Sequence, residues 1–373
     1  MTNDTHVIER LYARTAAYAA IDAVAGNEEA LVRRLVKDLA PWVDSIDVDP
    51  FGNVIGTKRG PEGAPSLMVS AHSDEIGAAV KAIEADGSLR FEAVGGVLES
   101  LLVGRAVRVA GINGVIGSRA GHITPPAERR TAPAMNELYV DVGCTSRDEV
   151  IALGIQIGDR IAYDSPVRKL GASNRIAGKA VDNRIGCALV VELAEALHET
   201  SLDCTVHFVV AVQEEVGLRG AQIVTYRLDP TAAIVVDTMP SGGTPDVSAT
   251  RHLSMEIGKG PVLTLISHSA GGGAIQQPGM RRFLERIADE RGVTYQRALF
   301  YGGNSDAAAV HLVRAGVPTG IINLARRYSH SPVETLDLDD AAQTLTWLIG
   351  AVEAFNASVD LSFLGADPLV DEE

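Results

Sequence analysis

Residues 66–75 read SLMVSAHSDE, a short apolar run that stops abruptly at His72, Asp74 and Glu75. A buried strand that ends in titratable side chains is typical of the rim of an α/β sheet, where binding sites are built. After residue 180, apolar strand segments again alternate with amphipathic helical ones. This alternation predicts an α/β fold with a mostly parallel sheet flanked by helices. The expected strands are 45–48, 53–57, 66–71, 204–212, 232–236 and 319–323, and the expected helices are 183–199, 218–227, 280–291, 305–315 and 339–355.

Residues 77–178 have a different texture. Segments such as AVRVAGINGVIGS (106–118) and GDRIAYD (158–164) are short, rich in Val and Ile and punctuated by Gly. Because long helical patterns are mostly missing here, we expect an inserted all-β domain, a small barrel-like one. The α/β domain would then comprise residues 1–76 and 179–373.

Composition narrows the range of partners. The 373 residues carry 33 Lys and Arg against 48 Asp and Glu, a formal net charge of −15. Such an acidic surface repels phosphate, so we expect no nucleic-acid partner and no anionic membrane surface. The three cysteines lie far apart without a CxxC pair, which is typical of a reducing compartment. No targeting or membrane-spanning segment is recognisable, so we expect a cytoplasmic protein.

Imidazoles and carboxylates recur just past strands or at element boundaries. Because strand ends converge at one edge of a parallel sheet, these side chains can meet there. Two imidazoles with several carboxylates form the ligand set of zinc or a similar divalent ion, and they suffice for two ions that share a carboxylate. The residues are His72 with Asp74, Asp182, Glu214 with Glu215, Asp237, and His330.

Two pairs of residues close in sequence, Glu214–Glu215 and His72–Asp74, indicate which side chains bind metal and which assist them. Adjacent strand residues point to opposite sides, so one of Glu214 and Glu215 can bind metal while the other takes a proton from water. Asp74, two residues after His72, can accept a hydrogen bond from the imidazole and fix its tautomer.

Each residue also has a purely structural interpretation. Asp182 is placed to cap the helix that starts at Asn183, and Asp237 precedes a turn-like Thr-Met-Pro segment. The Glu pair could lie on a solvated face, and a lone histidine after a strand is more often structural. The combination of five such places is what favours a metal site.

The motifs together resemble those of the glutamyl and deblocking aminopeptidase family, which includes the tetrahedral aminopeptidases. The resemblance runs from about residue 15 to 355. It is carried by AHSDEIG (71–77), GKAVDNRIG (178–186), VQEEVGLRGA (212–221), VVDT (235–238), GKGP (258–261) and RYSHSPVE (327–334).

The resemblance implies a catalytic domain of the phosphorylase/hydrolase-like, zinc-exopeptidase type and a barrel-like insert at 77–178 used for dimerisation. It implies two divalent metal ions, for which zinc is the first choice and cobalt the second. Asp182 would bridge the ions, Glu214 would be the general base, and Asp74 would orient His72. Glu215 and His330 would complete one metal site, and His72 and Asp237 the other.

The implied activity is a two-metal-dependent aminopeptidase that hydrolyses short peptides, with Glu214 activating the water that bridges the ions. A small-molecule amidase or deacylase on the same scaffold is the alternative. A non-catalytic assembly or binding protein is the alternative from another class. The family implies a homo-oligomer, from a dimer to a dodecamer.

Several substrate-facing positions depart from the family pattern. Ser329 stands where relatives often have a hydrophobic residue, Arg326 where they commonly have Thr, and His268 where they often have Asp. Asn304-Ser305 replaces a single Thr. Arg326 and Arg327 suggest a preference for an acidic first residue, although Arg327 is equally compatible with a structural role. We expect substrate contacts from Arg327, Tyr328 and Gly303, and assign no role to His122 or His268.

Overall fold

The computed structural model describes residues 2–128, 130–269 and 272–365. Among these residues, nine strands form one large sheet. Its centre, β12-β3-β13-β17, is parallel throughout, as the alternating pattern predicts. The strands lie in the order β1 (Ser45–Val48), β2 (Val54–Lys58), β12 (Thr205–Ala211), β3 (Ser66–His72), β13 (Ala232–Pro240), β17 (Thr319–Arg326), β14 (Val262–Ser269) and β15 (Gly272–Ile275), with β16 (Gln296–Tyr301) paired to β14.

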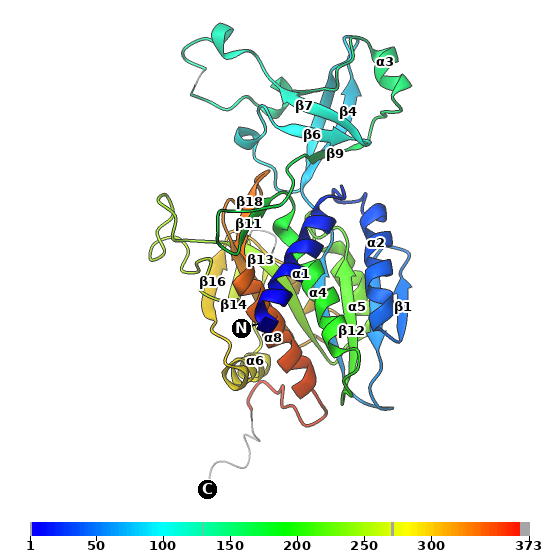
Figure 1. The fold of residues 1–373 in the computed structure, drawn as a ribbon, viewed down its shortest axis with the longest axis vertical. Coiled ribbons are helices and arrows are strands. Elements are labelled where there is room, and N and C mark those ends of the chain that lie inside the picture. The colour runs from blue at the N-terminus through cyan, green and yellow to red at the C-terminus, as the bar shows by residue number, and fades with distance from the viewer. Residues whose placement is uncertain (1, 129, 270–271, 366–373) are drawn as a thin grey trace.

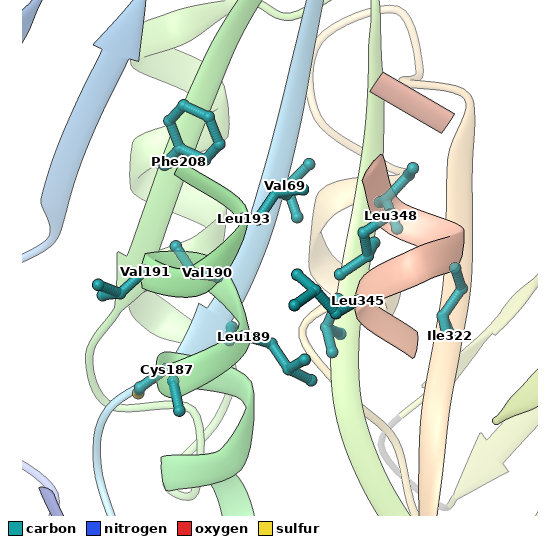
Figure 2. Packing of buried hydrophobic residues seen from close by; sticks show 14 of the residues in the cluster. Val69, Cys187, Leu189, Val190, Val191, Leu193, Phe208, Ile322, Leu345 and Leu348 are labelled. Carbon is teal, nitrogen blue, oxygen red and sulfur yellow. The ribbon is translucent and has the colours of Figure 1, made fainter. Parts of the chain in front are cut away.

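Helices cover both faces of this sheet. Alternate residues of β3 point to opposite faces, so Leu67 and Val69 join the larger core while Met68 joins a smaller one. Figure 2 shows the larger core, where Leu189 and Leu193 of one helix and Leu345 and Leu348 of another pack near Val69 and Ile322. The helices of the larger core are α1 (Thr2–Ala19), α2 (Glu29–Leu39), α4 (Val181–Leu197), α6 (Pro278–Arg291) and α8 (Leu338–Ala354); α5 (Arg219–Leu228) and α7 (Ala307–Val310) cover the other face.

A closed six-stranded antiparallel barrel stands at one end of the molecule (Figure 1). It has its own core, which includes Val80, Phe91 and Ile116. The fold class, an α/β sheet with a small β-barrel, is therefore confirmed. Around the barrel the strands are β4 (Gly77–Ile83), β5 (Leu89–Val94), β8 (Tyr139–Asp141), β7 (Ile112–Gly117), β6 (Ala106–Val109) and β9 (Arg160–Tyr163), accompanied by α3 (Arg147–Ala152) and the 3₁₀ turns η2 (Glu99–Leu101), η3 (Gly121–Ile123) and η4 (Met135–Glu137).

The barrel ends earlier than the segment 77–178 that the sequence suggested. Strands β10 (Arg168–Lys169) and β11 (Arg175–Gly178) lie outside it and form a separate three-stranded sheet with β18 (Glu334–Asp337). Residues 168–178 are thus tied to the α/β domain by long-range pairing, which local sequence texture does not reveal.

Several element boundaries also differ from the prediction. Strand β13 continues to Pro240 and pairs Asp237 with Asn323 of β17, so the interpretation of Asp237 as a turn residue is wrong. The helix expected at 305–315 is only the short α7. A 3₁₀ turn, η1 (Ala40–Trp42), follows α2. Across the described residues, no helix combines the length and the apolar character needed to cross a bilayer.

Candidate metal centre

A cleft of about 500 Å³ opens at the carboxyl edge of the central strands. It collects residues from parts of the chain that are far apart in sequence. His72, Asp182, Glu214, Glu215, Asp237 and His330 all line it. Asp74 does not line it; it is fully buried and accepts the backbone N–H groups of Glu214 and Glu215.

His72 and Asp237 are placed by neighbouring strands. In the register of β3 and β13, Ser70 pairs with Val235. His72 follows Ser70 by two residues, and Asp237 follows Val235 by two residues. Because side chains alternate along a strand, both functional groups lie on the same face of the sheet. His72 Nε2 lies 3.5 Å from Asp237 Oδ1, and both residues are buried.

Asp182 lies at the start of α4 with non-helical dihedral angles of φ −79° and ψ 109°. The neighbouring Asn183 takes the capping role, since its Oδ1 accepts a hydrogen bond from the Gly186 N–H at 3.0 Å. The interpretation of Asp182 as a helix cap is therefore wrong. Its Oδ1 lies 3.3 Å from His72 Nε2, and its Oδ2 lies 3.7 Å from His330 Nε2. One carboxylate thus faces two imidazoles with separate oxygens.

Glu214 and Glu215 are not on a strand, contrary to the prediction. Strand β12 ends at Ala211, Gln213 has a φ of 57°, and the carbonyl of Glu214 accepts the N–H groups of Gly217 and Leu218 in a turn. Both carboxylates face the cleft. Glu214 Oε2 lies 4.0 Å from His72 Nε2, whereas Glu215 Oε2 lies 3.5 Å from His330 Nε2. The turn directs the two carboxylates toward different imidazoles.

Asp74 holds this turn in place. Its Oδ1 and Oδ2 accept the backbone N–H groups of Glu214 and Glu215 at 2.9 and 3.0 Å. Asp74 Oδ1 also lies 3.5 Å from His72 Nδ1, a nitrogen that makes no hydrogen bond to any of the described residues. The sequence drew attention to Asp74 for its neighbour His72; its contact with the Glu pair became visible only in the structure.

Glu334 is a further organising residue that sequence analysis did not single out. Its buried carboxylate accepts the backbone N–H of Asp182 and that of His330, both at 2.9 Å. It also accepts a hydrogen bond from Arg326. The only available signal was its position at the end of the RYSHSPVE motif.

Burial and mutual repulsion raise the pKa values of several carboxylates in this cluster. Burial and the negative charge of Asp182 raise the pKa of Glu215 to about 8, and burial together with Glu215 and Asp237 raises the pKa of Glu214 well above its usual range. Burial opposes protonation of His72, but Glu214, Asp182 and Asp237 outweigh it and raise the pKa of the imidazole well above its usual value. Such a cluster retains protons where a cation would fit.

The residues fit two divalent cations. Ligand atoms lie within 4.8 Å of one another in the set His72–Asp182–Asp237 and in the set Asp182–Glu215–His330, which share Asp182. Within the described part of the chain, the buried Oδ1 of Asp182 has no hydrogen-bond partner. Imidazole and carboxylate donors suit zinc and similar ions. A third set, His72–Glu214–Glu215, satisfies the same distance limit.

The residues expected to contact substrate are distributed unevenly. Gly303 lines the cleft, together with Phe300, Asn304 and Ser269, whereas Arg327 and Tyr328 do not line it. His268 is exposed and its ring lies 5.9 Å from that of Tyr301, and His122 is exposed on the barrel. Neither His122 nor His268 belongs to the metal-ligand sets of the described residues.

Comparison with known proteins identifies the family. The family model described as M42 glutamyl aminopeptidase matches residues 52–346. The lysyl aminopeptidase of Pyrococcus furiosus is 32% identical over 330 residues, covering 86% of this chain and 91% of that protein. The glutamyl aminopeptidase of Lactococcus lactis is 31% identical over 353 residues, covering 93% and 97%.

A solved structure agrees with the sequence comparisons. The TET1 peptidase of Pyrococcus horikoshii, which can assemble into a tetrahedron or a large octahedral shell, superposes with a TM-score of 0.82 at 28% identity. The superposition covers 94% of this chain and 100% of that one. The chain therefore belongs to the M42 glutamyl aminopeptidase family, and it is an aminopeptidase, an enzyme that hydrolyses peptide bonds.

Proposed function

We propose that this enzyme uses two divalent metal ions to remove N-terminal residues from short peptides. The observation that carries the proposal is Asp182, whose two oxygens face two separate ligand sets. His72 and Asp237 would complete one site, and Glu215 and His330 the other. Zinc is our first choice of metal and cobalt the second.

A bound pair of such ions supplies a Lewis acid for the scissile carbonyl and lowers the pKa of the attacking water. Glu214 is the proposed general base, because neither of the two sets that share Asp182 needs it as a ligand. Its carboxylate lines the cleft, so it can accept a proton from water and deliver it to the leaving amine. Asp74 positions Glu214 through the backbone hydrogen bond.

The supporting observations for substrate and assembly come from the cleft and the relatives. A cleft of about 500 Å³ suits a short peptide, and the two named relatives are a lysyl and a glutamyl aminopeptidase. We propose a homo-oligomer, since the TET1 peptidase can assemble into a tetrahedron or a large octahedral shell. The barrel is the dimerisation surface that we propose for it. We place the enzyme in the cytoplasm, since all three cysteines are free.

The variant Glu214→Gln tests the proposal. It should bind metal like the wild type and lose about 10²–10⁴-fold in kcat on a leucyl chromogenic substrate, the range typical of a general base. Glu290→Gln, on the exposed side of α6, is the control and should keep full activity. Normal turnover by Glu214→Gln would reject Glu214 as the base.

A substrate comparison tests the reaction class. The metal-loaded enzyme should cleave a free tripeptide and leave its N-acetylated form intact. Hydrolysis of the acetyl group without cleavage of the free peptide would instead identify a deacylase.

A further inference from the structure

The two oxygens of Asp182 have unequal surroundings. Oδ1, which faces His72, is buried and has no hydrogen-bond partner among the residues that the structure describes. Oδ2, which faces His330, accepts a hydrogen bond from Nη2 of Arg326. A carboxylate oxygen that already holds a guanidinium has less negative charge to offer a second cation. The carboxylate shared by the two proposed metal sites therefore holds the guanidinium on its His330 side, whereas its other oxygen faces the His72 imidazole.

Arg326 is fixed in this position. It is the last residue of β17, and only 3% of its surface is exposed. Its Nε donates to Thr238 Oγ1 at 2.6 Å, and its Nη1 donates to Glu334 Oε1. Because Glu334 also holds the backbone N–H groups of Asp182 and His330, the guanidinium is anchored to the segments that carry the ligands. An arginine side chain keeps its positive charge at every relevant pH.

The histidine of the Glu215–His330 set is also more exposed to solvent than the histidine of the other set. The side chain of His72 is 2% exposed, and that of His330 is 33% exposed. A ligand open to solvent gives a cation less shielding from competing water. Both differences, the paired oxygen and the exposed imidazole, belong to the Glu215–His330 side.

We propose that Arg326 weakens cation binding at the Asp182–Glu215–His330 set relative to the His72–Asp182–Asp237 set, so that the two ions bind in a defined order. The inference rests on the proposed two-metal function. The guanidinium repels a divalent cation that approaches Oδ2, and this repulsion is strong because the site is buried. The repulsion falls mainly on the His330 side, since that is where Oδ2 points.

Titration of metal-depleted enzyme with Co²⁺, followed by calorimetry and by visible absorption, measures binding without turnover. The wild type should show two steps of unequal affinity. In Arg326→Gln, which keeps hydrogen-bond donors and removes the charge, the second step should tighten by about tenfold or more while the first changes little. Arg326→Lys, the matched control that keeps the charge, should retain the wild-type spacing.

The outcomes separate this inference from the proposed function. A wild type that binds two ions in equal steps, or an Arg326→Gln variant whose second step stays the same or weakens, overturns the role of Arg326 alone. A wild type that binds no Co²⁺ overturns the two-metal function itself.

A second variant covers the case in which Arg326→Gln unfolds because the buried Glu334 loses its counter-charge. The double variant Arg326→Gln/Glu334→Gln removes both charges of the pair. It should also bring the two steps closer together than in the wild type. A spacing that stays unchanged in the double variant would contradict the proposal.

Discussion

The two halves of the proposed metal centre use the same kinds of side chain on different scaffolds. His72 and Asp237 lie on adjacent strands of the buried sheet, and backbone pairing fixes their positions. Glu215 and His330 lie in loops, and His330 has a φ of 55°. The loop ligands depend on hydrogen bonds from outside their own segments. Asp74 holds the N–H of Glu215, and Glu334 and the Gly96 carbonyl hold His330. The sheet itself therefore positions His72 and Asp237, which we call the strand half of the site. Glu215 and His330, the loop half, need supporting side chains.

The change that removes the link between the halves should have the largest effect. In Asp182→Asn, a neutral amide replaces the carboxylate common to the two candidate ligand sets, so both proposed cation sites would lose a charged ligand. We expect the metal content to fall and activity to fall by more than the ~10–100-fold that is typical of outer-shell substitutions. Elemental analysis and kcat/KM measure both effects, with Asp289→Asn on the exposed side of α6 as the control. Two ions retained at wild-type activity would show that Asp182 is not shared.

A smaller effect is expected from Asp74→Asn, which tests the support of the loop half. The amide NH₂ introduced by this substitution would oppose one of the two N–H groups that Asp74 now accepts, and the turn that carries Glu214 and Glu215 would shift. We expect a loss of about 10–100-fold in kcat/KM. Because His72 stays on its strand, one Co²⁺ should still bind in a titration. Loss of both ions would mean that Asp74 supports the strand half equally.

The loop half should also make the metal-depleted enzyme sensitive to alkaline pH. Burial and Asp182 raise the pKa of Glu215 to about 8; burial opposes protonation of His330, but Asp182 and Glu215 raise its pKa to about 9. Both folded-state pKa values lie above the usual values of 4.5 for a Glu and 6.5 for a His. Over the ranges between the usual and the raised pKa of each group, the folded state therefore binds more protons than the unfolded state. Stability should therefore fall as the pH rises through them.

Thermal midpoints of the metal-depleted enzyme at pH 6 and pH 9 measure this loss, and we expect a lower value at pH 9. Enzyme loaded with zinc and freed of excess metal should lose less, because the cations replace the retained protons. A midpoint that is unchanged or higher at pH 9 in the depleted enzyme would contradict the assigned shifts.

The smallest effect concerns the first residue of the substrate. Arg326 lines the cleft, but its guanidinium is paired with Asp182 and Glu334, and Arg327 does not line it. We therefore expect no acid selectivity, with kcat/KM values for glutamyl and leucyl chromogenic substrates within about tenfold of each other, or ~1.4 kcal/mol. A strong preference for the glutamyl derivative would show that Arg326 serves the substrate rather than the loop half.

The strand half was the more predictable one. The apolar runs of β3 and β13 end near His72 and Asp237, and a parallel sheet brings such ends together. The loop half was not predictable in the same detail. Gln213 adopts a positive φ that no glycine signals. The alternation of strand side chains therefore does not apply to Glu214 and Glu215, and both carboxylates face the cleft.

Two further features needed tertiary information. A carboxylate at a helix start is compatible with both capping and metal binding, and only the structure shows that Asn183 caps while Asp182 points into the cleft. Likewise, strands β10 and β11 resemble the barrel strands locally, and only their pairing with β18 assigns them to the α/β domain.

Anomalous diffraction at the zinc edge, from crystals of the zinc-loaded enzyme, would locate the ions themselves. We predict two peaks roughly 3.5–4 Å apart with Asp182 between them. One should be bound by His72 and Asp237, and the other by Glu215 and His330. A single peak, or peaks that do not contact Asp182, would contradict the shared-carboxylate centre.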